Sequence, residues 1–210
     1  MPNWVTTKAT VAGPADKLDE FVDRHFKDGA LSFETVVPSP PRREDCPDKY
    51  ILGKDSHVME LDDRPWFNWY TWNLDNWGCK WDCGMLETVF TDEVGVCFSF
   101  QTPWAFPEPV AIAMAKMNPD LDFTFEYADE DIGTNCGIFA VHTDNGDVQV
   151  DFTDMDGNYE FACRIRGRDY EEFCEEYLED RPPLSVPVSV PVAALEYGAD
   201  DETADCKDRE

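Results

Sequence analysis

The sequence has few basic residues. Its 210 residues include 17 Lys and Arg against 45 Asp and Glu, which gives a formal net charge of -28 and an isoelectric point near 4.1. A surface this negative repels nucleic-acid phosphates and anionic membranes, and it attracts basic protein surfaces. We therefore expect no direct binding of nucleic acid or membrane. The composition is also typical of a salt-adapted protein, since Asp outnumbers Glu 27 to 18 and only eight residues are Lys.

Long apolar runs, paired cysteine motifs and glycine-rich phosphate loops are absent as well. No stretch approaches the roughly 20 apolar residues of a membrane span, and the N-terminus has no signal-peptide pattern. We therefore expect a cytoplasmic protein. The eight cysteines are scattered singly, which favours free thiols over disulfides. Cys79 and Cys83 lack the second pair of ligands that a zinc site needs, so we expect no metal and no cofactor.

The sequence contains no recognisable catalytic grouping. Its three histidines are not placed with a serine and an acid as nucleophilic catalysis requires, and His25 is expected on the polar side of a helix. Residues 154–160 resemble part of a calcium loop, but Gly157 comes too early for that pattern. We therefore expect no catalytic residues and a protein that is not an enzyme.

The spacing of apolar residues predicts an α+β fold. The order strand, helix, strand, excursion, strand, helix, strand is typical of a ferredoxin-like α/β sandwich with a split β-α-β arrangement. We expect this domain over residues 1–180, with a large aromatic insertion at about 38–95, a β extension at about 136–165, and a partly disordered, Pro-containing acidic tail at 181–210. Strands are predicted over residues 3–11, 31–37, 85–90, 96–101, 121–127, 137–143, 147–152 and 159–164, and helices over residues 15–26, 107–118 and 168–178.

Residues 66–82 hold five of the seven tryptophans. Large aromatic side chains of this kind either seal one end of a core or form a platform that binds a planar ligand or a partner. We favour the structural interpretation and keep the ligand site as an alternative. The candidate residues of this aromatic region are Trp69, Tyr70, Asn76, Trp77, Lys80, Trp81 and Asp82.

Residues 117–163 contain twelve acids and no Lys or Arg. Alternation along the strand predicted at 121–127 places Asp122, Thr124 and Glu126 on one side and apolar residues on the other. The pattern therefore predicts an acidic face, which could substitute for the phosphate rows of DNA on a basic protein. The expected partner-binding residues are Asp120, Asp122, Glu126, Asp129, Glu130, Asp131, Asp144, Asp147 and Asp151.

Several segments resemble a known family. The resemblance rests on four segments: Met1-Pro2-Asn3-Trp4-Val5, residues 31–40, the run from Trp69-Tyr70 to Asn76-Trp77-Gly78-Cys79-Lys80-Trp81-Asp82, and residues 100–109. Together they resemble the YubB-type ferredoxin-like domain family of phage and plasmid proteins, over roughly residues 1–140. Cys79 stands where that family's pattern has Thr. The resemblance implies a ferredoxin-like fold and a mobile-element origin, and it implies no activity.

These observations lead to one main expectation and two alternatives. We expect a non-enzymatic, acidic interaction protein of a phage or plasmid. It would act in the host cytoplasm and bind a basic surface of a host nucleic-acid-handling or defence complex by DNA-like charge mimicry. One alternative is a small-ligand-binding or enzymatic domain that uses residues 69–82. The other is a salt-adapted acidic domain whose charge has no binding function.

Overall fold

The computed structural model of the chain describes residues 2–27, 30–39, 60–61, 64–65, 69–91 and 95–177. Residues 40–59 of the expected insertion and the expected tail at 181–210 lie outside the described residues. The strands are β1 Trp4–Ala12, β2 Phe26–Lys27, β3 Ala30–Leu31, β4 Glu60–Leu61, β5 Arg64–Pro65, β6 Gly84–Thr91, β7 Val96–Pro103, β8 Asp122–Asp129, β9 Gly137–Asp144 and β10 Asp147–Asp154. The helices are α1 Ala15–His25, η1 Phe33–Thr35, α2 Trp69–Trp77, α3 Glu108–Met117, α4 Tyr159–Arg166 and α5 Tyr170–Tyr177.

Six strands form one antiparallel sheet in the order β10-β9-β8-β1-β7-β6. β1 lies in the middle and pairs with β7 on one side and β8 on the other. Chain order through β1, α1, β6, β7, α3 and β8 is the strand–helix–strand–strand–helix–strand order of a ferredoxin-like fold. β9 and β10 extend the sheet beyond β8 as a hairpin. The fold class that we predicted from the sequence is therefore confirmed.

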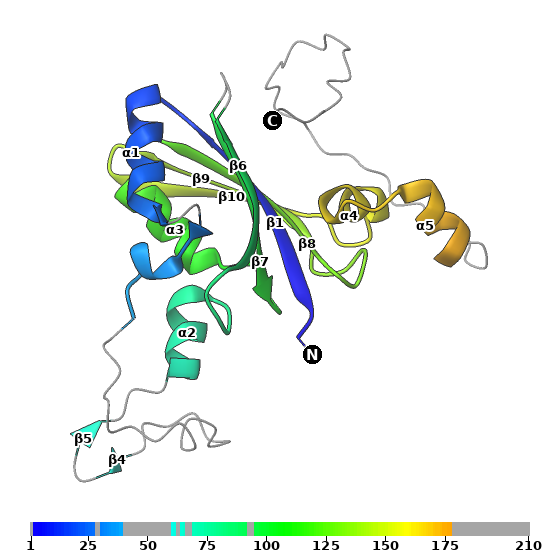
Figure 1. The fold of residues 1–210 in the computed structure, drawn as a ribbon, viewed down its shortest axis with the longest axis horizontal. Coiled ribbons are helices and arrows are strands. Elements are labelled where there is room, and N and C mark those ends of the chain that lie inside the picture. The colour runs from blue at the N-terminus through cyan, green and yellow to red at the C-terminus, as the bar shows by residue number, and fades with distance from the viewer. Residues whose placement is uncertain are drawn as a thin grey trace.

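The sheet has helices on both faces. α1 and α3 lie on one face, which we call the inner face, while α4 and α5 lie on the outer face (Figure 1). The main core is between the inner face and the two helices, where the Phe21 ring of α1 lies 5.5 Å from that of Phe123 and 6.2 Å from that of Phe98. Full burial of such a side chain contributes about 1.5–3 kcal/mol. In the described part of the chain, no helix is long and apolar enough to cross a bilayer.

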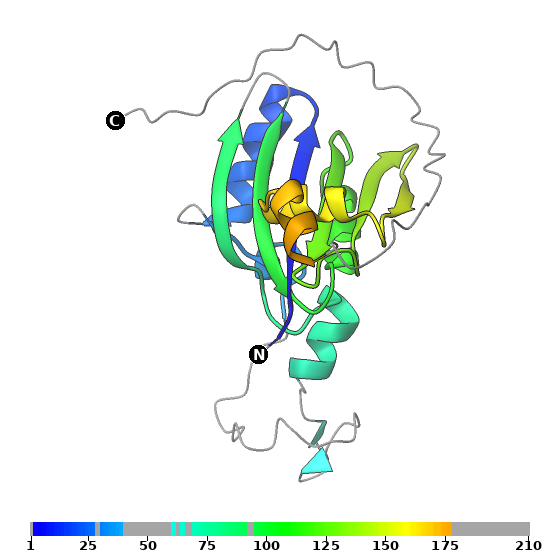
Figure 2. The ribbon, with the colours of Figure 1, turned by 90° about the vertical axis from the view of Figure 1, so that its right-hand side faces the viewer.

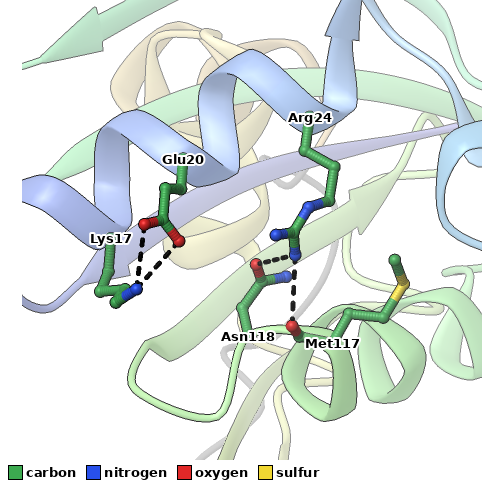
Figure 3. A network of polar contacts seen from close by, with 5 residues as sticks. All are labelled: Lys17, Glu20, Arg24, Met117 and Asn118. Carbon is green, nitrogen blue, oxygen red and sulfur yellow. Dashed lines mark hydrogen bonds and ion pairs between the residues drawn. The ribbon is translucent and has the colours of Figure 1, made fainter.

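Polar side chains join α1 to the end of α3 (Figure 3). Arg24 donates hydrogen bonds to the Asn118 side-chain oxygen at 3.2 Å and to the Met117 carbonyl at 3.3 Å. One turn away, Lys17 forms an ion pair with Glu20 within α1 at 3.0 Å. The first set links the two helices across the inner layer. The second stays on the surface of one helix and contributes little stability.

His25 is fully buried under this junction, so its expected place on the polar side of α1 was wrong. Its Nδ1 lies 3.2 Å from the Thr35 hydroxyl, and its Nε2 accepts a hydrogen bond from Asn118 at 3.4 Å. The Thr35 hydroxyl donates its own proton to the Ser32 carbonyl at 2.7 Å, so it accepts from His25 Nδ1. This network selects the neutral imidazole with its proton on Nδ1.

Two predicted strands are absent. Residues 31–37 form only the short strand β3 and the 3-10 helix η1, because the Asp82 carboxylate accepts hydrogen bonds from the Phe33 amide and the Ser32 hydroxyl, both at 2.7 Å. Residues 159–164 lie in the helix α4, whose first turn is capped by the Asn158 side chain accepting from the Phe161 amide at 3.0 Å. β6 therefore occupies the outermost position beside β7.

Candidate interaction surface

The outer face of the sheet is only partly covered. α4 packs against β8 and β1, and Figure 2 shows it in front of the middle strands with β9 and β10 to one side. Arg164 forms an ion pair with Glu126 at 2.8 Å, and Arg166 donates to the Thr6 hydroxyl at 2.6 Å and to the Trp4 carbonyl at 3.1 Å. Glu126, expected on the acidic face, is therefore already paired within the fold.

The remaining expected acids fall into two groups. The β9–β10 hairpin lies beside the start of β8, since Val141 pairs with Phe123. Glu130 and Asp131 follow the other end of β8, about 26 Å from Asp122 at ~3.3 Å per residue. The carboxylates on the hairpin half, which we call the hairpin-side acids, are all exposed; they are Asp120, Asp122, Asp144, Asp147 and Asp151.

Asp129 does not belong to any exposed acidic face, although the sequence pattern placed it there. It is 4% exposed. Its carboxylate accepts hydrogen bonds from the Asn3 and Asn135 side chains, each at 3.1 Å, and from the Asp131 amide at 3.0 Å. The residue thus ties the chain segment before β1 to the loop after β8. Its role is structural, because a buried carboxylate is stable only with such partners.

The aromatic region contains a helix that closes one end of the inner layer. α2 packs against α3, and Trp77 at its end is 4% exposed. The Trp77 indole nitrogen donates to the Val37 carbonyl at 2.9 Å, and its ring lies 5.9 Å from that of Phe33. Gly78 ends α2 with φ at 77°, and a Cβ there would lie 2.8 Å from Pro109 Cδ of α3. The Trp-Gly pair is therefore required by packing.

Two further members of the aromatic region hold the chain that follows α2. Asp82 accepts from the Cys83 amide at 2.8 Å, in addition to its bonds to η1. Asn76 donates to the Trp72 carbonyl at 2.9 Å within α2. Both side chains therefore hold local structure around α2 and η1.

The other members of the region lie at the surface. Tyr70 and Trp81 are partly exposed, and Trp69 packs edge-on against Tyr70 at 5.9 Å. The Lys80 ammonium lies 4.4 Å from the Trp81 ring centroid and 5.8 Å from that of Tyr70. Such cation–π contacts contribute about 0.5–1 kcal/mol at exposed sites. They form a small aromatic surface on the α2 side of the molecule.

The thiols near this region are held in the protonated form. The Cys79 thiol donates to the Trp81 carbonyl at 3.2 Å and the Cys83 thiol to the Leu31 carbonyl at 3.0 Å. Burial raises the pKa of Cys79 to about 12, and burial also raises the pKa of Cys83. Thiols in this state are poor nucleophiles and poor metal ligands. No cluster of three or more His, Cys, Asp or Glu side chains that could hold a metal occurs among the described residues.

The partial calcium-loop pattern at residues 154–160 is a helix-start turn. Asp156 accepts from the Cys136 amide at 2.9 Å, and Asp154 accepts from the Asp156 amide at 2.9 Å. Asn158 caps α4. These oxygens are used to place α4 beside β8, and the turn explains the acids here without a bound ion.

Sequence reasoning missed one exposed feature, on β10. Val150 is 43% exposed and Phe152 is 56% exposed, although both lie on the inner, apolar side of the sheet. α3 packs mainly over β9 and reaches β10 only in part. The alternation of Val, Val and Phe in residues 147–154 was the available signal. Alternation of this kind is typical of a strand with one buried side, but the helical layer is too narrow to bury this side of β10.

The comparisons with known proteins concern the second half of the chain. Residues 80–175 match the model of a family described as the ferredoxin-like domain in Api92-like protein. The matched segment begins shortly after α2 and ends within α5, so it contains β6 to β10 and leaves β1 and α1 outside. No curated protein and no solved structure matches the chain. The chain therefore contains a ferredoxin-like domain similar to that of Api92-like proteins.

Proposed function

We propose that the chain is an acidic interaction protein that binds a basic surface of a nucleic-acid-handling protein, where its carboxylates take the place of DNA phosphates. The phage or plasmid origin implied by the YubB-type resemblance is part of this proposal. The observation that carries it is the exposure of the hairpin-side acids on one half of the sheet. None of these five carboxylates forms an ion pair with a described residue.

Basic residues on the outer face of the sheet are occupied inside the fold. Lys8, on the outer face of β1, donates to the Arg164 carbonyl at 3.1 Å. Arg164 pairs with Glu126, and Arg166 bonds to the start of β1. Acids on the hairpin half therefore form no ion pair with these residues, and a basic partner would neutralise their negative potential.

The sheet also fixes four of these acids in space. Asp122 and Asp151 lie on the outer face of β8 and β10, and Asp147 pairs with Asp144 across a two-residue turn at Asn145 and Gly146. Carboxylates on paired strands need little further ordering when a partner binds, which lowers the entropic cost of association. Repulsion of free DNA and attraction of DNA-binding proteins follow from the same charge.

The test is competition with DNA. Immobilised chain captures proteins from a host lysate at low salt, and the captured protein is identified and purified. The proposal predicts that duplex DNA and the chain exclude each other from this protein, so that the apparent dissociation constant of the chain rises in proportion to DNA concentration. A stable ternary complex of partner, DNA and chain would refute the charge-mimicry proposal.

The aromatic surface of Tyr70, Lys80 and Trp81 supports the alternative, a small-ligand site, less well. Trp77, one of the three tryptophans expected in that site, is packed in the core. The Lys80 ammonium is already in contact with aromatic rings of the same surface. A planar ligand would have to displace these contacts before it could stack there.

A further inference from the structure

β10 forms one edge of the sheet. It pairs with β9 and with no other strand in the described part of the chain, and Figure 2 shows it at the side of the molecule away from α4 and α5. Edge strands are usually protected from pairing by Lys, Pro, a bulge or short length. β10 has eight residues in uninterrupted register with β9, and contains neither Lys nor Pro.

The backbone groups that face the open edge belong to four residues of β10, which are Val148, Val150, Phe152 and Asp154. Met155 and Cys136 lie opposite each other if the β9–β10 register is continued by one residue, and the Met155 amide donates to the Cys136 carbonyl at 3.0 Å. The pair of Met155 and Cys136 is therefore a hydrogen-bonded pair. Hydrogen-bonded and non-hydrogen-bonded pairs alternate along an antiparallel ladder, so the odd-numbered residues of β10 bond to β9. The four even-numbered residues direct their N–H and C=O groups outward.

Three of these four residues, Val148, Val150 and Phe152, carry the apolar side chains of the strand. Val150 and Phe152 are the exposed pair described above, and Val148 packs partly against the core. Unpaired backbone groups and uncovered apolar side chains therefore coincide along one edge. A strand that paired there would form hydrogen bonds with these backbone groups and cover these apolar side chains.

We propose that this edge pairs with β10 of a second copy of the chain, around a two-fold axis at Val150. This register places Val150 opposite its own copy and Val148 opposite Phe152, all in hydrogen-bonded pairs on the inner side. On the outer side Gln149 faces Asp151, whose carboxylate can accept from its amide. Two sheets of six strands would then become one continuous sheet, a self-complementary contact of the kind that two-fold dimers require.

Charge selects this register over its neighbours. An axis at Gln149 would place Asp147 directly opposite Asp151, and an axis at Asp151 would place Asp151 opposite its own copy. Like charges directly opposite each other destabilise strand pairs. In the Val150 register Asp147 faces Thr153, and no Asp of β10 faces another. The strand sequence is therefore complementary to itself in one register only among these three.

The net charge of -28 on each copy opposes this pairing at low salt. Screening shortens the range of that repulsion to about 10 Å at 0.1 M salt and about 3 Å at 1 M. Self-association should therefore strengthen as salt is added. Binding of a basic partner should weaken under the same change, so this inference stands or falls separately from the proposed function.

The test is sedimentation equilibrium of the full chain with reductant present, at 0.05 M and 1 M NaCl. We expect a dimer whose dissociation constant decreases with salt, and a Val150→Lys variant at least ~10-fold weaker because two Lys side chains would face each other. Leu74→Lys is the control: this residue of α2 is 40% exposed, close to the 43% of Val150, and its variant should dimerise normally. Circular dichroism checks that both variants fold.

Hydrogen exchange identifies the edge directly. Raising the chain concentration should slow exchange at the amides of Val148, Val150 and Phe152 and leave that of Asp151, which faces β9, unchanged. A chain that stays monomeric at 1 M salt would overturn the inference. So would a folded Val150→Lys variant that dimerises as well as the original chain, or a dimer that forms without protecting the three amides.

Discussion

The buried imidazole of His25 makes the stability of the protein depend on pH. Burial, with a smaller contribution from the Arg24 charge, lowers the pKa of His25 from 6.5 to about 4. Protonation would place a second N–H against the Asn118 side-chain amide, which already donates to Nε2. The unfolded chain therefore binds more protons than the folded chain between these pH values, and stability falls as pH falls.

The size of the effect follows from the two pKa values. A difference of about 2.5 units, at ~1.36 kcal/mol each, gives a loss of about 3 kcal/mol once pH is well below 4. About 2 kcal/mol of this is already lost at pH 5, because the unfolded imidazole is then almost fully protonated. Above pH 6.5 the contribution is fully present.

Urea unfolding between pH 7.5 and pH 4.5 measures this loss. Carboxylates also titrate in this range, so the informative quantity is the difference between the original chain and a His25→Gln variant, whose side-chain oxygen can still accept from Asn118. The original chain should lose about 2 kcal/mol more than the variant by pH 5. Identical pH dependence in the two chains, or an imidazole titration near 6.5 in the folded state by NMR, would refute this reasoning.

Three further predictions concern the aromatic region and the charge. Asp82→Ala should lower the free energy of unfolding by about 3 kcal/mol, because three hydrogen bonds to a carboxylate are lost. Asp75 is exposed on α2, and Asp75→Ala should change the free energy of unfolding by less than about 0.5 kcal/mol in the same urea assay. Gly78→Ala should lower the free energy of unfolding by about 1 kcal/mol more than Gly146→Ala does. Both glycines have positive φ, but only a Cβ at position 78 would contact another residue, Pro109. Equal losses of stability in the two variants would exclude a contribution from packing against Pro109. The melting temperature should rise with added NaCl mostly below about 0.3 M, because surface charges become screened in that range. A melting temperature that continues to rise up to molar salt would support the salt-adapted alternative.

The sheet was predictable because its strands alternate clearly. Residues 121–127 alternate acid or Thr with apolar side chains, and β8 exposes and buries them in that order over most of its length. The Asn145-Gly146 pair predicted the β9–β10 hairpin, and both residues have the positive φ that such a turn requires. Local signals of this kind do not depend on distant parts of the chain.

The failures trace to contacts between distant residues or to overlooked signals. The predicted strand at 31–37 is prevented by Asp82, about fifty residues away, which no local pattern could reveal. The α4 signals were present, since Asn158 and Gly167 are typical cap residues at either end of the helix. His25 also lies four residues after Phe21 and seven after Leu18, on the buried side of α1.

The acidic face was predictable in composition but not in extent. Alternation placed Asp122 and Glu126 on one side of β8 correctly, yet α4 returns across the sheet and brings Arg164 to Glu126. Asp129 was assigned to the same side by its charge, and its burial depends on Asn3 and Asn135 at distant positions. Which acids remain available is therefore a property of the tertiary structure.

The central claim is that the hairpin-side acids bind a basic partner, and two charge-matched variants test it most directly. One carries Asp122→Asn, Asp147→Asn and Asp151→Asn, and the other carries Asp16→Asn, Asp19→Asn and Asp23→Asn on exposed α1 positions. Each changes the formal charge from -28 by +3 to -25.

The measurement is the dissociation constant of each variant for the purified partner, at 0.1 M salt and at a chain concentration where the chain is monomeric. Three exposed charge contacts at ~0.2–1 kcal/mol each predict that the first variant binds about 3-fold to about 150-fold more weakly than the original chain. The α1 variant should bind within about twofold of the original chain, since its lost charges lie on α1, which covers the opposite face of the sheet from Asp122 and Asp151 (Figure 1). Equal weakening in both variants would contradict the account, because net charge alone would then explain the binding.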